Sequence, residues 1–433
     1  MIERVLAVRM VCAAIVGFAP LRALAETPPQ PPSPSSVTID QAIDEALAHN
    51  LTLLAERSNL SIADAAIVTA RLRPNPVLSL SADHLDWLGT GFDETNGGGP
   101  SEYAARVDVP IERGGKRNAR NEVAASARTA AEAQFADAVR TLRLDVTLAC
   151  IDVLAAEATR DLVADTLRSF EDLARVNEAR VAAGAIAPYE STRSQIAMLQ
   201  FRSTVTKAEL DLAAATARLR VLLGRPPSNP LDVSGDLSAP QELAPIRVDD
   251  LDSRAFESRP DLRALQLEEA RSTADLRLQQ ANGKIDYLVG AEYRRQQGVN
   301  GTSNSLGFFF STPLPFSNRN QGEIARANAQ IVQGSQQVTA SKAGIEADVE
   351  SSLHEYTVTK ELVASIERDL LAPARNAQEI SSYTYRAGGS TLLELLDAQR
   401  AFNDTMQSYV DARASLRRAA SRLNAAVGAE VVR

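Results

Sequence analysis

The residues whose types could support catalysis or metal binding are few and scattered in this sequence. Three histidines and two cysteines are present: His49, His84, His354, Cys12 and Cys150. A protein metal site needs several ligands that recur at short spacings, and these five residues show no such spacing. Gly114-Gly115-Lys116 lacks the Walker spacing and its Ser or Thr, so it is no phosphate loop. We therefore expect no enzyme, no bound cofactor and no resident metal.

Net charge and chain length further restrict the class of protein to which this chain can belong. The chain has 433 residues, and its 55 Asp and Glu outnumber its 46 Lys and Arg, which gives a formal net charge of −9. A protein that binds nucleic acid usually carries a basic face, so we expect no nucleic-acid partner. The length provides enough material for one large domain or two ordinary domains.

The N-terminus has the pattern of an export signal. Arg4 and Arg9 precede an apolar run from Val11 to Ala19, and Ala23-Leu24-Ala25 matches a small-x-small cleavage site. The sequence therefore predicts a signal peptide over residues 1–25.

No lipid anchor or membrane helix is expected after this signal. Cys12 lies inside the apolar run and follows Val11 rather than a small residue, which argues against a lipidated cysteine. No later segment has 18 apolar residues in a row. Residues 26–37 are rich in proline and predict an extended tether.

Beyond the tether, the period of the apolar residues changes from helix to strand and back. Thr38 and Gln41 have capping-box spacing, and no glycine or proline occurs from residue 37 to 73, so a long helix is expected to start here. Alternation over about residues 77–86 and 102–110 predicts two strands. Residues 116–223 predict a helical hairpin with its turn at Gly184, and its first helix would reach roughly 100 Å.

The same pattern then occurs a second time, which is the most informative feature of the sequence. Corresponding positions at a nearly constant offset are Asn50 and Arg259, Leu51 and Pro260, Pro110 and Pro313, Gly184 and Gly388, Glu190 and Glu394, and Gly224 and Gly428. The sequence therefore predicts three parts: repeat 1 over 38–224, a connector over 225–247 and repeat 2 over 248–433. Repeat 2 is expected to contain strands at about 285–297 and 304–313 and a helical hairpin over 320–428. Each repeat is thus helix, strand, strand, very long helix, turn, helix.

This architecture restricts what the chain can form. The four strands are about as long as a tilted strand that crosses an outer membrane. Four strands cannot close a barrel, and open strand edges are not tolerated in lipid, so the chain must associate with copies of itself. Long alanine-rich helices suit the side-by-side packing of many helices into a hollow cylinder.

Three short motifs carry a resemblance to a known family. They are Pro110-Ile111-Glu112-Arg113-Gly114-Gly115-Lys116-Arg117, Arg259-Pro260-Asp261-Leu262-Arg263, and the paired turns at Gly184 and Gly388. Through them the mature chain resembles the TolC-like outer-membrane efflux proteins, and the Glu-Arg-Gly-Gly-Lys-Arg run is most similar to the CzcC-type branch, which serves heavy-metal cation efflux pumps. The resemblance implies a mostly α fold with a small β part, in which a homotrimer forms a twelve-stranded outer-membrane β-barrel that continues into a long periplasmic α-helical barrel. It also implies three partners: a periplasmic adaptor (membrane fusion protein), an inner-membrane RND pump and outer-membrane lipid.

The resemblance further assigns roles near the two turns. Glu394 and Asp397 fall on an acidic ring that narrows the periplasmic entrance, and their i, i+3 spacing places them on one helix face. Six such carboxylates in a trimer would attract cations and act as a gate and cation filter. Tyr385 matches a tyrosine that ties the closed entrance to a neighbouring helix, and Glu190 matches its acidic partner. The turn residues expected to dock on the adaptor are Gly184, Ala185, Ile186, Ala187, Pro188, Gly388, Gly389, Ser390 and Thr391.

The function so implied is a passive duct in the outer membrane of a Gram-negative bacterium that exports heavy-metal cations such as cobalt, zinc, cadmium or nickel. A duct for drugs or for type I protein secretion has the same architecture. A secreted coiled-coil structural protein is the alternative from another class, and the two strand pairs argue against it. For the site residues, the structural alternatives are a solvated helix end for Glu394 and Asp397 and ordinary turn glycines at Gly184, Gly388 and Gly389.

Overall fold

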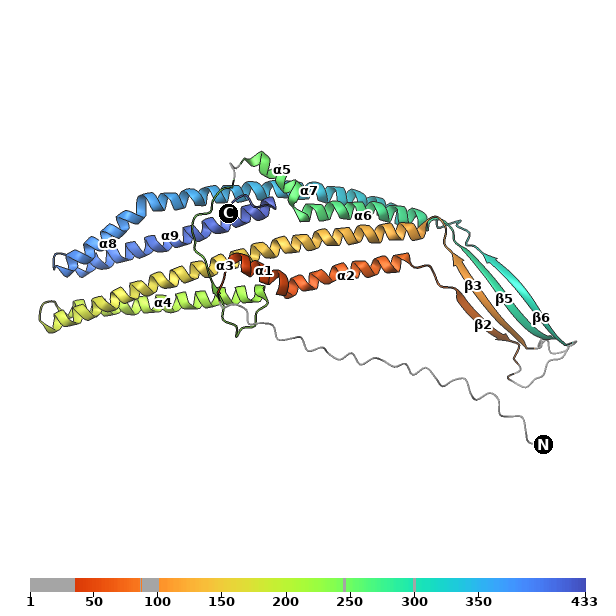
Figure 1. The fold of residues 1–433 in the computed structure, drawn as a ribbon, viewed down its shortest axis with the longest axis horizontal. Helices are drawn as coiled ribbons and strands as arrows, with labels where there is room; N and C mark the ends of the chain where they lie inside the picture. Colours follow the sequence, from red (N-terminus) through yellow and green to blue (C-terminus); the bar gives the residue numbers. More distant parts are fainter. Residues whose placement is uncertain (1–35, 86, 88–100, 244–246, 299–300) are drawn as a thin grey trace, which may run out of the picture. The chain divides into compact units, whose positions relative to one another are not determined.

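The computed structural model describes residues 36–85, 87, 101–243, 247–298 and 301–433 (Figure 1). The predicted signal peptide, nearly all of the tether and the Gly-rich loop between the first two strands lie outside the described residues. Residues Ser36–Arg433 form one compact unit, and the following description is confined to it.

The first helical segment is interrupted once. Helix α1 (Ile39–His49) begins with the expected capping box, in which the Thr38 amide donates to Gln41 Oε1 at 3.0 Å. Asn50 then takes an extended conformation, and helix α2 (Leu51–Arg71) begins after it. The expectation of an unbroken helix is wrong here because the Asn50 side chain accepts a hydrogen bond from the Leu53 amide at 2.9 Å and caps a new helix.

Each repeat continues with two strands and a helical hairpin. In repeat 1 these are β2 (Val77–Asp83), β3 (Glu102–Ile111), α3 (Lys116–Ala182) and α4 (Pro188–Leu223). Repeat 2 consists of α5 (Val248–Ser258), α6 (Pro260–Asn282), β5 (Tyr287–Gly298), β6 (Gly301–Ser311), α7 (Gln321–Ser365), a π-helical turn (Ile366–Leu370), α8 (Leu371–Arg386) and α9 (Leu392–Val427). Within the described residues, none of the helices combines the length and the apolar composition that crossing a membrane requires.

The largest differences between the observed and the sequence-based bounds are in two strands, and the connector also differs from expectation. Strand β2 ends at Asp83 rather than near residue 86, and β6 begins at Gly301 rather than near residue 304. The connector is not wholly irregular, because its strand β4 (Asp232–Val233) pairs in parallel with β1 (Ser36–Val37).

The four long strands form one antiparallel sheet in the order β2-β3-β5-β6. The central pair β3–β5 joins the two repeats, with Val107 opposite Ala291. Within the unit, the sheet lies at the end of the long helices that is opposite to the two hairpin turns (Figure 1). The register therefore fixes the two repeats side by side at the sheet.

The duplication is visible in atomic contacts as well as in element order. The helix-ending glycines Gly224 and Gly428 have φ of +69° and +72°. A Cβ on Gly224 would lie 2.4 Å from the carbonyl oxygen of His49, and one on Gly428 would lie 3.3 Å from the backbone nitrogen of Arg259. In both repeats the end of the hairpin thus packs on the break between the two preceding helices.

Candidate functional site

The two hairpin turns close in the same way. Gly184 and Gly388 have φ of +72° and +77°, and a Cβ on either residue would contact nothing within 4 Å. The Ala185 amide donates to the carbonyl of Arg180 at 2.8 Å, and the Gly389 amide donates to that of Thr384 at 2.8 Å. Left-handed backbone, rather than close packing, therefore explains both glycines.

The turns are largely open to solvent. The exposed turn residues are Gly184, Ala185, Ala187, Pro188, Gly388, Gly389 and Thr391, whereas Ile186 and Ser390 are partly buried. Ser390 is within hydrogen-bond distance of the Thr384 hydroxyl, at 3.1 Å. No described residue of the chain covers the exposed turn residues, so another protein could contact them.

Next to the turns, two polar contacts join the second hairpin to the first. The Tyr385 hydroxyl donates to Asn177 Oδ1 at 2.8 Å, and Tyr385 and Asn177 are 4% and 0% exposed. Arg180 donates from Nη2 to the carbonyl of Arg386 at 2.7 Å, and its guanidinium lies 5.5 Å from the centre of the Tyr385 ring. Residues of α3 therefore hold the last turn of α8.

This arrangement differs from the pairing that the resemblance implies. Within the chain, the acceptor for the Tyr385 hydroxyl is Asn177 and not Glu190. Burial raises the pKa of the Tyr385 phenol, and the negative charge of Glu190 also raises it. A neutral amide as acceptor avoids the cost of burying a carboxylate at this position.

An apolar cluster surrounds the Tyr385–Asn177 bond. Its buried members are Phe170, Ala197, Tyr385, Leu392, Leu395 and Leu396. The rings of Phe170 and Phe201 stack with their centres 4.5 Å apart, which joins α3 to α4. A cavity of about 680 Å³ borders this cluster and is lined by Arg175, Arg180, Gln378, Tyr385 and Gln399, among others. The hairpins are thus held by apolar packing and a few buried polar contacts.

Glu394 and Asp397 lie on the exposed side of α9, opposite Leu395 and Leu396. Glu394 completes a capping box, because its Oε2 accepts from the Thr391 amide at 3.1 Å and its amide donates to Thr391 Oγ1 at 3.3 Å. Asp397 is 4.0 Å from Arg400. The capping box follows from the Thr-x-x-Glu spacing, a signal that our sequence reasoning missed at this turn.

The π-helical turn Ile366–Leu370 bends the second hairpin. Figure 1 shows α7 and α8 running in different directions on either side of it. Pro373 explains the irregularity, because a proline lacks the N–H that would bond to the carbonyl four residues earlier and its ring crowds that carbonyl. The sequence contains this signal, and the expectation of a regular hairpin over 320–428 overlooked it.

Of the residues considered above for metal binding, Cys12 lies outside the described residues. No group of three His, Cys, Asp or Glu side chains among the described residues could hold a metal ion. Cys150 is fully buried beside residues such as Val146 and Leu219, and burial raises the pKa of its thiol to about 12. Cys150 is therefore a small packing residue.

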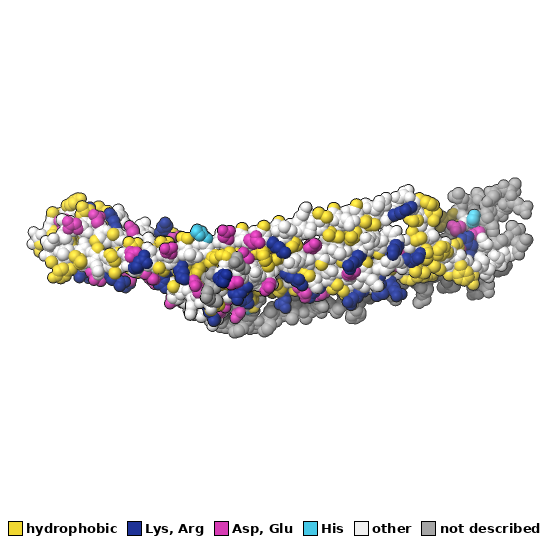
Figure 2. Space-filling model, turned by 90° about the horizontal axis from the view of Figure 1, so that it is seen from above, with side chains coloured by type: hydrophobic (Ala, Val, Ile, Leu, Met, Phe, Trp, Pro, Cys, Tyr) yellow, Lys and Arg dark blue, Asp and Glu magenta, His cyan; other side chains and the backbone are white. Residues whose placement is uncertain are grey.

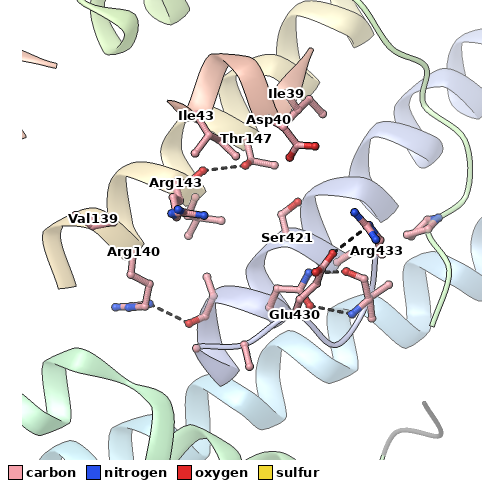
Figure 3. Close-up of a pocket in the computed structure, with 18 of the residues that line it drawn as sticks. Ile39, Asp40, Ile43, Val139, Arg140, Arg143, Thr147, Ser421, Glu430 and Arg433 are labelled. Carbon is pink, nitrogen blue, oxygen red and sulfur yellow. Dashed lines mark hydrogen bonds and ion pairs between the residues drawn. The ribbon is translucent and has the colours of Figure 1, made fainter. Parts of the chain in front are cut away.

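A second cavity, of about 720 Å³, lies where α1, α3 and the C-terminal end of α9 meet (Figure 3). Charged residues of both signs line it, among them Asp40, Arg140, Arg143, Glu430 and Arg433. Arg140 donates to the carbonyl of Ala425 at 2.9 Å, and Arg433 lies 3.5 Å from Glu430. The cavity lies at the junction of the two repeats. Its hydrogen bond from Arg140 to Ala425 joins α3 of repeat 1 to α9 of repeat 2.

The sheet has two chemically different faces. Large apolar side chains lie in register on one face: Leu78, Leu80, Tyr103, Val107, Val109, Val289, Tyr293, Leu306, Phe308 and Phe310. The other face carries ion pairs, with Arg106 at 2.8 Å from Asp108 and Arg294 at 2.9 Å from Glu102. Such alternation is typical of strands that have lipid on one side and water on the other.

Comparisons with known proteins agree with this geometry. The family model "Outer membrane efflux protein" matches residues 42–225 and 251–429. The chain is 24% identical over 393 residues, 90% of both chains, to the cobalt-zinc-cadmium resistance protein CzcC of Cupriavidus metallidurans. It is 25% identical over 278 residues, 64% of this chain and 61% of the other, to the nickel-cobalt-cadmium resistance protein NccC of Alcaligenes xylosoxydans xylosoxydans.

A solved structure has the same fold. The outer membrane channel CmeC of Campylobacter jejuni superposes with a TM-score of 0.76 at 13% identity, over 90% of this chain and 85% of that one. The two-part match of the family model follows the duplication described above. This chain belongs to the outer membrane efflux protein family, and it is a passive channel protein of the outer membrane rather than an enzyme.

Proposed function

We propose that three copies of this chain form a passive duct that exports heavy-metal cations across the outer membrane. In this proposal the duct receives its cargo from an inner-membrane pump of the RND type through a periplasmic adaptor. The cargo is inferred from the names of CzcC and NccC, which are cobalt-zinc-cadmium and nickel-cobalt-cadmium resistance proteins.

One observation supports the proposal that the chain forms a duct. The four-stranded sheet presents an apolar face and a charged face, and its outer strands β2 and β6 have no further neighbour among the described residues. Unpaired edges are costly in lipid, and closure with two further copies would give a twelve-stranded barrel with the apolar face outward. The polar face, with the pairs Arg106–Asp108 and Arg294–Glu102, would then line the water-filled lumen.

The opposite end would be the periplasmic entrance. The exposed turns around Gly184 and Gly388 would dock on the adaptor, and Glu394 and Asp397 would contribute an acidic ring in the trimer. The contacts of Tyr385 with Asn177 and of Arg180 with Arg386 would hold the entrance narrow. Residues 1–25 would be removed on export, and the mature chain would carry no lipid.

A deletion strain tests the function. Its growth is measured in the presence of zinc, cadmium, cobalt or nickel, and in the presence of a panel of drugs and detergents. Plasmids that carry the wild-type gene or one variant test whether tolerance is restored. Sensitivity to metals alone supports the proposal. Sensitivity to drugs alone would keep the duct and overturn its cargo, and the absence of any phenotype would contradict metal export as its main task.

Two variants on one strand make this test specific for the membrane role. Phe308 is 85% exposed on the apolar face, whereas Ser305 lies on the polar face opposite Arg294. We expect Phe308→Asp to abolish complementation because it places a charge in lipid, and Ser305→Asp to complement because it faces water. Equal complementation by both variants would contradict the assignment of the two faces.

A further inference from the structure

A dense group of exposed cations lies where the strands join the long helices. Its members, called here the basic collar, are Arg71, Arg73, Arg113, Arg117, Lys284 and Arg319. Such a concentration is unexpected in a chain whose formal net charge is −9. In Figure 2, Lys and Arg side chains gather beside the band of hydrophobic side chains near the sheet end of the helices.

Backbone and side-chain contacts show that the collar is one continuous surface. Arg117 Nε donates to the carbonyl of Arg71 at 2.7 Å, which joins the end of α2 to the start of α3. Gly114 lies against the aliphatic part of Lys284, since a Cβ on Gly114 would be 2.6 Å from Lys284 Cδ. Gly283 is equally close to the backbone of Arg319, because a Cβ there would be 2.7 Å from its carbonyl oxygen. Segments of both repeats therefore bring these cations together.

The carboxylates nearest to the collar already have other partners. Glu112 forms an ion pair with Arg120, and the hydrogen bond from Arg120 lowers the pKa of Glu112. Lys116 Nζ lies 2.6 Å from Asp286 Oδ2. Burial alone would raise the pKa of Asp286, but the hydrogen bond from Lys116 outweighs burial, and the pKa of Asp286 lies below its usual value. None of the six collar cations forms an ion pair with a carboxylate of a described residue. Their charge therefore remains available to a ligand.

The surroundings of the collar are those of a membrane surface. Leu314 and Phe316 are 68% and 82% exposed directly after β6, and Leu72 is 61% exposed between two collar residues. The Arg113 guanidinium lies 4.4 Å from the centre of the Tyr287 ring, at the start of β5. Aromatic and basic residues that border an apolar band are typical of the level of the lipid headgroups.

We propose that the basic collar binds the phosphate headgroups of anionic phospholipids in the leaflet on the helical side of the sheet. The inference rests on the proposed function, which places the sheet in the outer membrane and the helices in the periplasm. Guanidinium groups match phosphate oxygens in charge and geometry, and the adjoining apolar face accepts the acyl chains. Continuity with that face favours a phospholipid over free phosphate as the occupant.

The test uses the full mature chain, reconstituted in phosphatidylcholine vesicles with a trace of spin-labelled lipid. Electron spin resonance measures how strongly labelled phosphatidylglycerol associates with the protein relative to labelled phosphatidylcholine. We expect the wild type to prefer phosphatidylglycerol about fivefold, as expected for roughly one well-placed cation per lipid. The preference should fall as salt rises, because exposed charges are screened.

The test variant is Arg71→Gln, Arg73→Gln and Lys284→Gln combined, because none of these side chains hydrogen-bonds to a described residue. It should clearly lower the preference for phosphatidylglycerol, because it removes three of the six collar cations. The control, Arg168→Gln, Arg175→Gln and Arg368→Gln, removes the same charge from helix surfaces away from the sheet, where these side chains are 70 to 77% exposed. It should leave the preference unchanged.

The possible outcomes are distinct. Equal association of both lipids with the wild type, or an unchanged preference in the collar variant, would overturn the inference. Loss of the preference on addition of inorganic phosphate, where sodium chloride of equal ionic strength has no such effect, would show a free-phosphate site and would also overturn it. A wild-type chain that does not enter phosphatidylcholine vesicles would refute the proposed function, whereas insertion without lipid preference would refute only the collar.

Discussion

The Tyr385 hydroxyl and Asn177 Oδ1, 2.8 Å apart, connect two helices from different repeats of the chain. Both side chains are buried, and Asn177 Nδ2 has no partner among the described residues. The bond is therefore a polar contact inside the apolar cluster that holds the hairpins together. Under the proposed function, this bond would lie at the periplasmic entrance and help to hold it narrow.

Tyr385→Phe should weaken this attachment without changing the packing volume. We expect a loss of about 1 kcal/mol in the free energy of unfolding, typical of one neutral hydrogen bond. In planar bilayers the variant should spend more time in a high-conductance state, because one of the two polar contacts between α3 and α8 is lost while the bond from Arg180 to the Arg386 carbonyl remains. Tyr383→Phe is the control, since Tyr383 is on the same helix but 75% exposed. Indistinguishable single-channel records for the two variants would exclude Tyr385 as part of the closing contact.

The proposed acidic ring is tested by removing charge while keeping the helix cap. Glu394→Gln preserves the capping box, because glutamine serves at this position as well as glutamate, and Asp397→Asn removes the second carboxylate. The double variant should lower the cation-to-anion permeability ratio in planar bilayers and leave the melting temperature nearly unchanged.

Two single variants separate charge from capping. Glu394→Ala removes both the charge and the bond to the Thr391 amide, and it should cost about 1 kcal/mol in stability. Asp404→Asn removes a charge farther along α9 and should leave selectivity unchanged. A permeability ratio that stays the same in the double variant would remove Glu394 and Asp397 from the filter.

The features that could be predicted from the sequence depend on periodicity. Alternation of apolar and polar residues located the strands, since Leu306, Phe308 and Phe310 lie on one face of β6. Gly224 and Gly428 could be matched because left-handed helix ends favour glycine in both repeats. Such signals are local, and they do not need the partner segment to be known.

The contacts at the entrance have no comparable signal. Asn177 and Arg180 lie inside the 67-residue helix α3, and nothing in their spacing distinguishes them from other polar residues there. The partner of Asn177 is 208 residues away, so only the packing of the two hairpins brings it close. The break at Asn50 was equally hidden, because asparagine can continue a helix or cap one.

The helix-ending glycine Gly224 and the hairpin-turn glycine Gly184 should respond differently to substitution by alanine. Gly224→Ala adds left-handed strain and also places Cβ 2.4 Å from the His49 carbonyl oxygen, so the backbone must shift. Gly184→Ala adds only the strain, about 1–2 kcal/mol, because a Cβ there contacts nothing within 4 Å. Denaturant unfolding should therefore rank Gly224→Ala as clearly less stable than Gly184→Ala. The opposite order would show that the contact between α4 and α1 relaxes easily.

Asp261 predicts how stability depends on pH. Burial disfavours its charge, but the buried Arg259 side chain, whose Nη2 lies 2.6 Å from Asp261 Oδ2, lowers the pKa of Asp261 overall. The stability that this ion pair contributes is therefore complete above the usual aspartate pKa of about 4, and it is lost as the pH falls through the lowered value. Asp348 also contacts Arg259, at 3.1 Å, but it is 61% exposed.

Asp261→Asn should cost about 1.5–3 kcal/mol near pH 7, because it removes a charged partner from a buried guanidinium. Asp348→Asn should cost less than about 1 kcal/mol, as for an exposed ion pair. The melting temperatures of wild type and Asp261→Asn should converge as the pH falls towards about 3, since the wild-type carboxylate is then increasingly protonated. A difference that stays constant from about pH 7 to about pH 3 would show that Asp261 acts through packing and not through its charge.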